Sequence, residues 1–251
     1  MKKTQTSGFT GHTLKLIALI TMFIDHIGAI LLEYGLLPSI SDAVLAGNSF
    51  DYLPADYQFW SIFNLILRLI GRLAFPLYCF LLVEGFLHTK SITKYAFRLG
   101  VFALLSEIPF DLAVSNTYFN IEMQNVFFTL LIGLLVLWGM KAFEKLPFPM
   151  TLLRYLVALV GMRLADFIHS DYTAYGILLI VLLYELRSNK KWKCISGAVL
   201  TFFQSITGAL AFIFIGFYNG DRGKQLPKYF FYAFYPAHLL LLFLVRMLLL
   251  S

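Results

Sequence analysis

Charged residues are scarce in this chain of 251 residues. Asp, Glu, Lys and Arg together make up 14% of it, whereas hydrophobic residues make up 59%. A soluble globular domain carries about 25% charged residues, so this chain has too few polar side chains to cover a soluble protein of its size. The same composition excludes intrinsically disordered and fibrous classes. The sequence therefore predicts an integral membrane protein.

Cysteine is also rare, and repeats are not evident. Cys79 and Cys194 each lie within an apolar segment, and the sequence has no CxxC or Cys/His spacing. This pattern indicates neither a disulfide framework nor a zinc site, and we expect no metal.

The net charge of +6 comes from basic residues in short clusters between apolar runs. Because a nucleic-acid-binding protein gathers its basic residues on one stripe, we expect no nucleic acid partner.

Long apolar runs make up most of the sequence. A bilayer core about 30 Å thick needs roughly 20 apolar residues per helix. The runs predict a single all-α domain over residues 1–251, a polytopic membrane helical bundle of about eight or nine transmembrane helices. The predicted runs are Leu14–Leu32, Phe59–Leu87, Tyr95–Val114, Asn125–Phe143, Met150–Ile168, Tyr172–Leu186, Cys194–Phe217 and Tyr229–Leu250.

Two of these runs do not fit a single straight span. Phe59–Leu87 is too long, and we expect an interfacial piece over Phe59–Ile70 followed by a span that starts near Gly71. Cys194–Phe217 is predicted to be one long helix or two short helices, broken around the polar residues of Gln204–Gly208.

The distribution of Lys and Arg between loops predicts the orientation, since cytoplasmic loops carry the excess of these residues. Alternate loops are basic, whereas Glu33–Trp60, Ser115–Gln124 and Asp166–Asp171 contain neither Lys nor Arg. We therefore expect a cytoplasmic N-terminus, with a retained first helix, in a multi-pass protein of a bacterial plasma membrane. The loop Tyr218–Lys228 is basic too, which requires Cys194–Phe217 to cross twice or to re-enter. The basic residues that set this orientation are Lys2, Lys3, Lys15, Lys90, Lys94, Arg98, Lys141, Lys145, Arg154, Arg187, Lys190, Lys191, Lys193, Arg222, Lys224 and Lys228.

The first span contains the adjacent pair Asp25 and His26. A charged group deep in a span costs about 2.5–3.5 kcal/mol on insertion scales, so it invites an explanation. Adjacent helical residues point about 100° apart, so each of these two needs a partner on another helix. His26 is the first catalytic candidate, because an unperturbed imidazole accepts and returns a proton near neutral pH.

Other polar groups lie in or beside later spans. Arg68 and Arg72 have i,i+4 spacing, which predicts one shared helix face. Glu107 precedes Pro109, which we expect to break its helix locally. His238 follows an aromatic belt and is a second catalytic candidate, although a helix–helix hydrogen bond explains it equally well. For the whole set, the competing interpretation is that the charges pair with one another and hold the helices in register.

The segment Tyr218-Asn219-Gly220-Asp221-Arg222-Gly223-Lys224 predicts a tight polar turn, because Asn-Gly is a turn dipeptide. Glycines let backbone amides approach an anion, and Arg and Lys are the side chains that bind phosphate. An ordinary basic cytoplasmic loop remains the alternative.

Several blocks together resemble a known family. The opening block is Met22-Phe23-Ile24-Asp25-His26-Ile27-Gly28, and the second contains Gly71-Arg72-Leu73-Ala74-Phe75-Pro76. Further blocks are Ser106-Glu107-Ile108-Pro109, the Asn219–Gly223 turn and Tyr235-Pro236-Ala237-His238. The chain is similar to the TraX family of membrane acetyltransferases, named for the conjugative pilin N-acetylase. The resemblance also suggests kinship with acyltransferase-3-like membrane enzymes, in which a first-helix histidine is thought to be catalytic.

The resemblance implies transfer of an acetyl group from cytoplasmic acetyl-CoA to an amine or hydroxyl acceptor at or across the membrane. The acceptor could be a protein N-terminus, a glycan or a small molecule. His26 would remove the acceptor's proton, and Arg72 or Arg68 would stabilise the oxyanion. Asp25 or Glu107 would hold the His or the Arg in position. The CoA phosphates would bind at the cytoplasmic mouth, at the turn that holds Asn219, Arg222 and Lys224 and at Lys228.

Two rival functions remain at this stage. Intramembrane Asp, His and Arg also mark ion pathways, so a proton-coupled transporter or channel is the first rival. Against it, the internal repeat that is the usual pointer to alternating access is not evident. A non-catalytic membrane scaffold is the second. A nucleophilic role for Cys79 is disfavoured, because a buried helical cysteine usually behaves as a small hydrophobe.

Overall fold

The computed structural model describes residues 8–38, 55–224, 227 and 229–250, and all regular structure within them is helical. This confirms the predicted all-α class. Two isolated backbone bridges, Phe9 with Tyr218 and Gln124 with Ser170, join loops. The predicted outer loop Glu33–Trp60 lies largely outside the described residues, as do Lys2 and Lys3. The elements in chain order are α1 Gly11–His26, η1 Ile27–Leu36, α3 Ala55–Gly71, α4 Ala74–His88, α5 Ile92–Ser115, α6 Val126–Phe143, η2 Met150–Leu152, α7 Leu153–Phe167, α8 Thr173–Glu185, α9 Lys190–Gln204, α10 Ile206–Ala209, α11 Ala211–Gly216 and α12 Phe230–Leu250.

Among the described residues, four helical stretches are long and apolar enough to cross a membrane, by length and composition. They are Gly11–Leu36, Tyr57–His88, Val126–Phe143 and Phe230–Leu249. Two shorter apolar stretches, Thr173–Glu185 and Ile206–Gly216, add to them. The other predicted spans correspond to α5, which carries several charges, and to α7 and α9, which are short. The protein is thus a helical membrane protein.

The first span changes its helical form at the position of His26. Thr10 caps α1 by accepting a hydrogen bond from the Thr13 amide. After His26 the backbone continues as a π-helix, η1, to Leu36. The predicted span Leu14–Leu32 is therefore correct in its core and several residues too short at its end.

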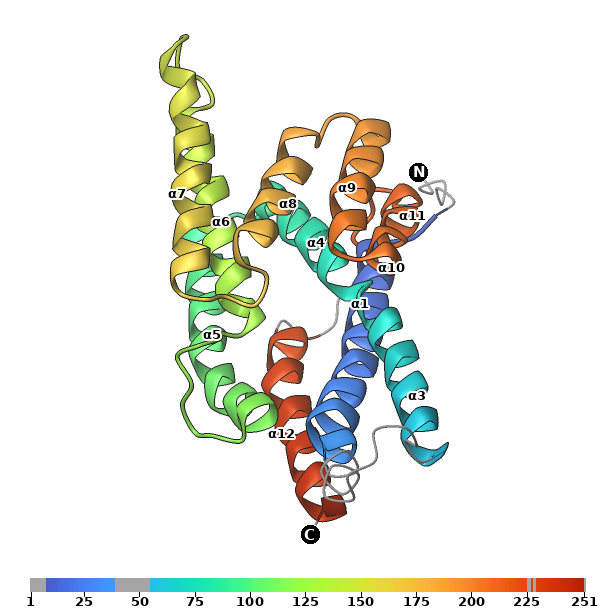
Figure 1. The fold of residues 1–251 in the computed structure, drawn as a ribbon. Helices are drawn as coiled ribbons and strands as arrows, with labels where there is room; N and C mark the ends of the chain where they lie inside the picture. Colours follow the sequence, from blue (N-terminus) through green and yellow to red (C-terminus); the bar gives the residue numbers. More distant parts are fainter. Residues whose placement is uncertain (1–7, 39–54, 225–226, 228, 251) are drawn as a thin grey trace.

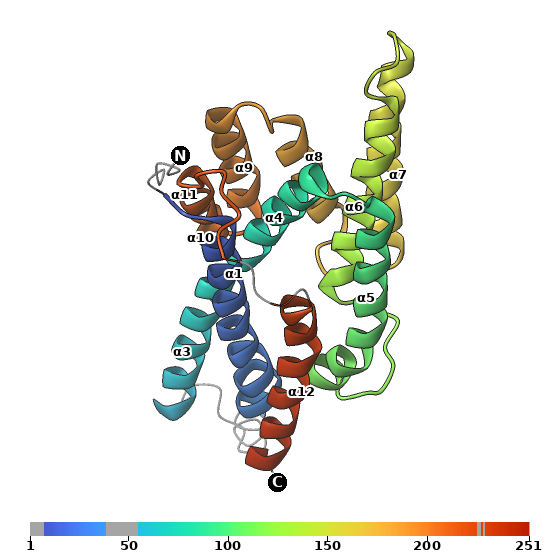
Figure 2. The ribbon, with the colours of Figure 1, turned by 180° about the vertical axis from the view of Figure 1, so that it is seen from behind.

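The second predicted run divides near Gly71, as expected. The helix α3 ends at Gly71 and α4 begins at Ala74. Figures 1 and 2 show α3 running beside α1, with which it packs, as it does with η1. The interfacial position of Phe59–Ile70 stays a prediction, whereas the structure shows that α3 packs along the apolar helix α1.

The helix α5 also corrects an expectation. It runs from Ile92 to Ser115 without the break predicted at Pro109. It begins at the cap Ser91, whose side chain accepts from the Lys94 amide, and it ends where Asn116 adopts a left-handed conformation. Proline removes one backbone hydrogen bond, and here the packing of α5 against α6 and α12 retains the helix.

The run Cys194–Phe217 forms a helical hairpin, as the polar break predicted. The backbone of Ser205 is extended between α9 and α10, and its side chain accepts from the Gly208 amide. The chain reverses there, so that Lys190 Nζ at the start of α9 donates to the Tyr218 carbonyl after α11 at 3.2 Å. Both ends of the hairpin therefore lie on one side of the protein, as the re-entry interpretation requires.

The N-terminal segment joins the same side. Phe9 exchanges backbone hydrogen bonds with Phe217 and Asn219, at 2.8 and 3.0 Å. Arg222 donates to the His88 carbonyl at 3.0 Å. Loops that the Lys and Arg distribution assigned to one face are thus joined in the structure, whereas the end of α12 lies at the opposite end of the molecule (Figure 1).

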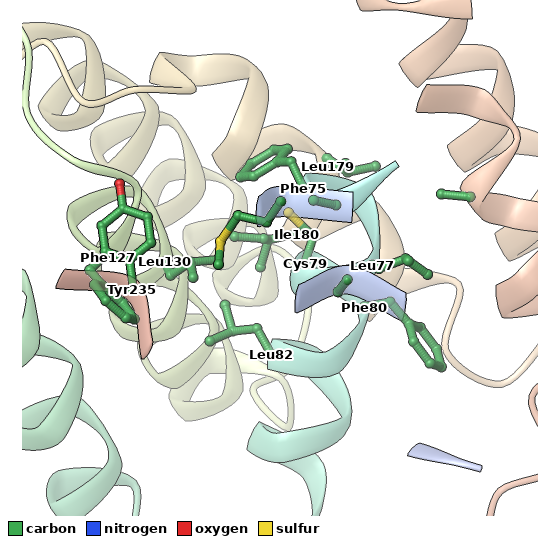
Figure 3. Packing of buried hydrophobic residues seen from close by; sticks show 14 of the residues in the cluster. Phe75, Leu77, Cys79, Phe80, Leu82, Phe127, Leu130, Leu179, Ile180 and Tyr235 are labelled. Atoms are coloured by element: carbon green, nitrogen blue, oxygen red, sulfur yellow. The ribbon is translucent and has the colours of Figure 1, made fainter. Parts of the chain in front are cut away.

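The core is centred on α4. It packs on α1, α8, α11 and α6, and it contributes Phe75, Leu77, Phe80 and other fully buried side chains. Figure 3 shows these residues between the helices, together with Phe127 of α6 and Tyr235 of α12. The last helix packs along α5 and against η1, and this placement brings its middle against the end of α1.

Candidate functional site

The two histidines predicted as catalytic candidates meet directly. Nδ1 of His26, at the end of α1, lies 2.8 Å from Nε2 of His238 in α12. The second ring nitrogen of His238, Nδ1, lies 2.7 Å from the Phe234 carbonyl oxygen one turn earlier. His238 is buried, with 3% of its surface exposed. Aromatic rings of Phe23, Phe234 and Tyr235 surround the pair and hold it in place.

Asp25 points to a different partner, as the 100° offset from His26 predicts. Its Oδ2 accepts from Nη1 of Arg68 at 2.5 Å, and Nε of Arg68 lies 3.1 Å from Glu33. Asp25 therefore positions an arginine and not the histidine. Its side chain rests on Gly71, where an added Cβ would overlap both Cβ and Oδ1 of Asp25. This contact and the ion pair fix α3 against α1.

Arg72 lies in the turn between α3 and α4, and its amide donates to the Arg68 carbonyl at 3.2 Å, which keeps the i,i+4 relation of the two arginines. Its positive charge acts on Asp25 and on Asp171, which follows α7. Asp171 is exposed at the surface of the protein, yet the surrounding protein desolvates its carboxyl group and raises the pKa to about 6. The negative charge of Asp25 raises this pKa further, whereas the positive charge of Arg72 lowers it. Sequence reasoning treated Asp171 only as one acidic residue of an outer loop, because nothing in its local pattern signals proximity to Asp25.

Glu107 binds neither the histidines nor the arginines. Its Oε2 accepts from Nδ2 of Asn125 at 2.5 Å, and the same amide donates to the Ala103 carbonyl at 2.8 Å. The Asn125 oxygen in turn caps α6 through the Phe127 amide. The predicted role of Glu107 in positioning a His or Arg is therefore not supported by its contacts; it joins α5 to α6. Its Oε1 is buried and makes no hydrogen bond.

A cavity of about 570 Å³ opens beside the joined loops. Five of its lining side chains are Lys or Arg, and one, Glu84, is acidic. Tyrosines and phenylalanines form much of the rest of the wall. A concave site of this size with convergent cations suits a ligand that combines several negative charges with an apolar part. The basic lining residues are Lys15, Lys90, Lys94, Arg98 and Arg222.

The predicted phosphate-binding turn contributes only partly to this cavity. Gly220 and Gly223 have positive φ values of 82° and 68°, so the turn forms as expected. Arg222 lines the cavity, whereas Lys224 is exposed and not among the lining residues. The Asn219 side chain accepts from the Asp221 amide and so shapes the turn. Lys228 lies outside the described residues.

The remaining cations of the cavity were not singled out from the sequence. Lys94 and Arg98 are i,i+4 neighbours at the start of α5 and were assigned only to a basic loop. Their spacing signals a shared face. A Cβ added at Gly85 would lie only 3.0 Å from the Tyr95 hydroxyl, which shows how closely α4 and α5 meet there. The Nε of Arg98 is buried and makes no hydrogen bond.

Aromatic rings separate the cavity from the histidine pair. Phe127 and Tyr232 line the cavity and stack with ring centroids 6.2 Å apart. Phe127 also contacts Tyr235 at 5.1 Å, and Tyr235 contacts His26 at 5.8 Å. The neighbouring positions of Phe127 and Tyr235 are visible in Figure 3. Two ring contacts, Phe127 with Tyr235 and Tyr235 with His26, therefore connect the cavity wall to His26.

Cys79 does not belong to this site. It is fully buried within the apolar core, beside Phe75 and Ile180 (Figure 3). Among the described residues, no group of three or more His, Cys, Asp or Glu side chains is placed to hold a metal ion.

The sequence profile of the family described as TraX protein matches residues 10–246. The chain belongs to the TraX family. The match includes every described residue of the histidine pair, of the Asp25–Arg68 contact and of the cavity. The TraX chain is also 27% identical to a protein of Dichelobacter nodosus described as probable fimbrial assembly protein FimC, serogroup H1, over 95% of this chain and 96% of that protein. No solved structure matches the chain.

Proposed function

We propose that this TraX protein is a multi-pass enzyme of a bacterial plasma membrane that transfers an acetyl group from acetyl-CoA to an amine or hydroxyl acceptor. The observation that carries the proposal is the cationic cavity, placed two aromatic contacts from a buried histidine pair. The cavity offers charge for the CoA phosphates, and the histidine offers a base. The name of the fimbrial relative makes a pilus subunit one candidate acceptor.

Acetyl-CoA fits this arrangement in length as well as in charge. Lys15 lines the cavity near the start of α1, and His26 ends the same helix. The separation of 11 residues corresponds to roughly 16 Å along an α-helix. CoA carries its thioester at the end of a long, flexible arm, so phosphates held by the basic residues leave the acetyl group free to reach the inner wall at Phe127.

The chemistry follows from the side chains at the inner end. The acceptor nitrogen or oxygen attacks the thioester carbonyl carbon while His26 takes its proton. A cation stabilises the resulting oxyanion. The candidates for this cation are Arg68, whose charge acts on His26 and which Asp25 and Glu33 hold in place, and Arg72. The carbon–sulfur bond then breaks, and the departing thiolate takes the proton from His26.

The donor site is tested by binding of acetyl-CoA to the purified protein, measured by isothermal titration calorimetry. We expect the Kd of Arg222→Ala and of Lys94→Ala each to rise about 10- to 100-fold, because a lost hydrogen bond to a charged group costs about 1.5–3 kcal/mol. Lys224→Ala is the matched control, since Lys224 lies on the same turn but does not line the cavity. If all three variants bind as the wild type does, the phosphates bind elsewhere; if the wild type does not bind, the donor is wrong.

The base is tested by transfer of radiolabelled acetyl groups from acetyl-CoA to a membrane extract of the producing bacterium. We expect His26→Ala to bind acetyl-CoA normally and to lose roughly 10² to 10⁴ in rate, the usual contribution of general acid–base catalysis. His26→Gln keeps size but not basicity and should be nearly as slow. Wild-type activity in the Gln variant would show that His26 is structural. His169→Gln, an exposed loop substitution, serves as the control.

A further inference from the structure

We infer that His238 is a positioning residue that holds His26 in the tautomer protonated at Nδ1, so that Nε2 of His26 is the free basic atom. The kinetic consequence rests on the proposed acetyl transfer, whereas the tautomer itself does not. The sequence left His238 open as a second base or as a helix–helix contact. The hydrogen bonds of the pair distinguish these roles.

The first step concerns His238. Its Nδ1 lies 2.7 Å from the carbonyl oxygen of Phe234. A carbonyl oxygen has no proton to give, so Nδ1 of His238 must donate. A neutral imidazole has one donor and one acceptor nitrogen. Nε2 of His238 is therefore an acceptor, and this nitrogen faces His26.

The second step transfers this constraint to His26. Nε2 of His238 and Nδ1 of His26 are 2.8 Å apart, and since the former accepts, the latter must carry the proton. The other nitrogen of His26, Nε2, then keeps its lone pair. In free histidine both tautomers are populated, so this contact selects the one in which Nε2 acts as a base.

The surroundings favour a neutral pair over an imidazolium. Phe23, Phe234 and Tyr235 provide rings, and the charged or titratable groups that act on His26 are His238 and Arg68. Asp25 is turned to Arg68 and supplies no counter-charge to the ring. The orienting group of His26 is thus a neutral imidazole, where many hydrolases use a carboxylate. It fixes geometry and tautomer without adding charge.

The chain is well suited to a direct test, since it has five histidines. Full-length protein labelled with ¹⁵N-histidine in lipid bilayers gives an NMR spectrum in which protonated and unprotonated ring nitrogens are resolved, and His26→Gln assigns the His26 signals. At pH 8 we expect His26 to be protonated at Nδ1 and unprotonated at Nε2. In His238→Leu we expect a mixture of both tautomers. In His238→Gln, whose side-chain oxygen can accept in place of Nε2, the wild-type tautomer should return.

The rates give the second readout. His238→Leu should lower kcat for acetyl transfer by roughly 10²-fold, the lower range for acid–base catalysis, with an unchanged KM for acetyl-CoA and with rescue by His238→Gln. His238→Gln also serves where His238→Leu does not fold. A wild-type His26 protonated at Nε2, or a tautomer unaffected by His238→Leu, would overturn the inference. The predicted tautomers without any acetyl transfer would refute the proposed function alone.

Discussion

At the scale of single residues, neighbours in sequence have separate tasks. Asp25 and His26 are adjacent, yet Asp25 pairs with Arg68 of α3 and His26 with His238 of α12. Helical geometry predicted that they diverge, and the need for partners followed from the cost of burying polar groups. The identity of those partners could not be predicted, because it depends on which helices pack together and not on local pattern.

A glycine in this region allows a further prediction. A methyl group at Gly71 would overlap Cβ of Asp25, which rotation of the carboxylate cannot relieve. We expect Gly71→Ala to lower stability by about 1–3 kcal/mol, as overpacking does, and to weaken the Asp25–Arg68 contact. Thermal unfolding in detergent measures the change. Gly100→Ala is the control, because the methyl group added there meets only Leu131 within 4 Å, at an ordinary contact distance of 3.7 Å. The Tm of this variant should be unchanged or higher, since alanine favours a helix more than glycine does. Equal Tm values for the two variants would contradict the prediction.

At the scale of helices, the apolar runs predicted where α6, α8 and the break at Ser205 occur. The hydrophobicity of a sequence shows how long each apolar helix is and where polar residues interrupt it, so these features could be predicted. The π-helical continuation after His26 and the unbroken course of α5 through Pro109 were not. Both depend on contacts with other helices, which override the local preference of the chain.

One ion pair joins two of these helices outside the apolar region. Glu144, after α6, accepts from Arg187, after α8, and from the Tyr184 hydroxyl. Burial of Glu144 opposes its ionisation, but the hydrogen bond and charge of Arg187 outweigh this effect, and the pKa of Glu144 falls below its usual 4.5.

A depressed carboxylate pKa contributes stability above the unfolded pKa, and that contribution is lost as the pH falls through the lower folded pKa. We expect wild type to have the higher Tm at pH 6, and this difference from Glu144→Gln to shrink as the pH falls to 3.5. The difference corresponds to about 1 kcal/mol or less, since the pair is partly exposed. Scanning calorimetry of both proteins across this range measures it, with Glu122→Gln in an exposed loop as the control. Parallel pH profiles for wild type and Glu144→Gln would rule out this contribution.

At the scale of the whole molecule, the alternation of basic and non-basic loops predicted which segments share a face. The contacts of Lys190 with Tyr218 and of Arg222 with His88 agree with that grouping. The position of the cavity could not be predicted in the same way. Its wall is assembled from α1, α4, α5, α6 and α12, and only the turn around Arg222 had a recognisable local signature.

The orientation in the membrane leads to a labelling prediction. In a background with Cys79 and Cys194 replaced by Ala, an impermeant maleimide should modify Thr117→Cys in intact cells. Ser188→Cys should react only after permeabilisation. Both positions are exposed, so accessibility differs only by side of the membrane. The reverse pattern would invert the proposed topology and move the cavity to the outer face.

The pairing of His26 with His238 joins residues 212 positions apart. During synthesis, a chain that has emerged through α11 already contains Asp25, Arg68, Arg72 and the start of the cavity wall. It still has no partner for His26. The last helix also brings Arg246, which donates to the carbonyls of Leu112 and Ala113 at the end of α5. The histidine pair therefore forms only once α12 is present, and a chain truncated before α12 carries a His26 without this partner.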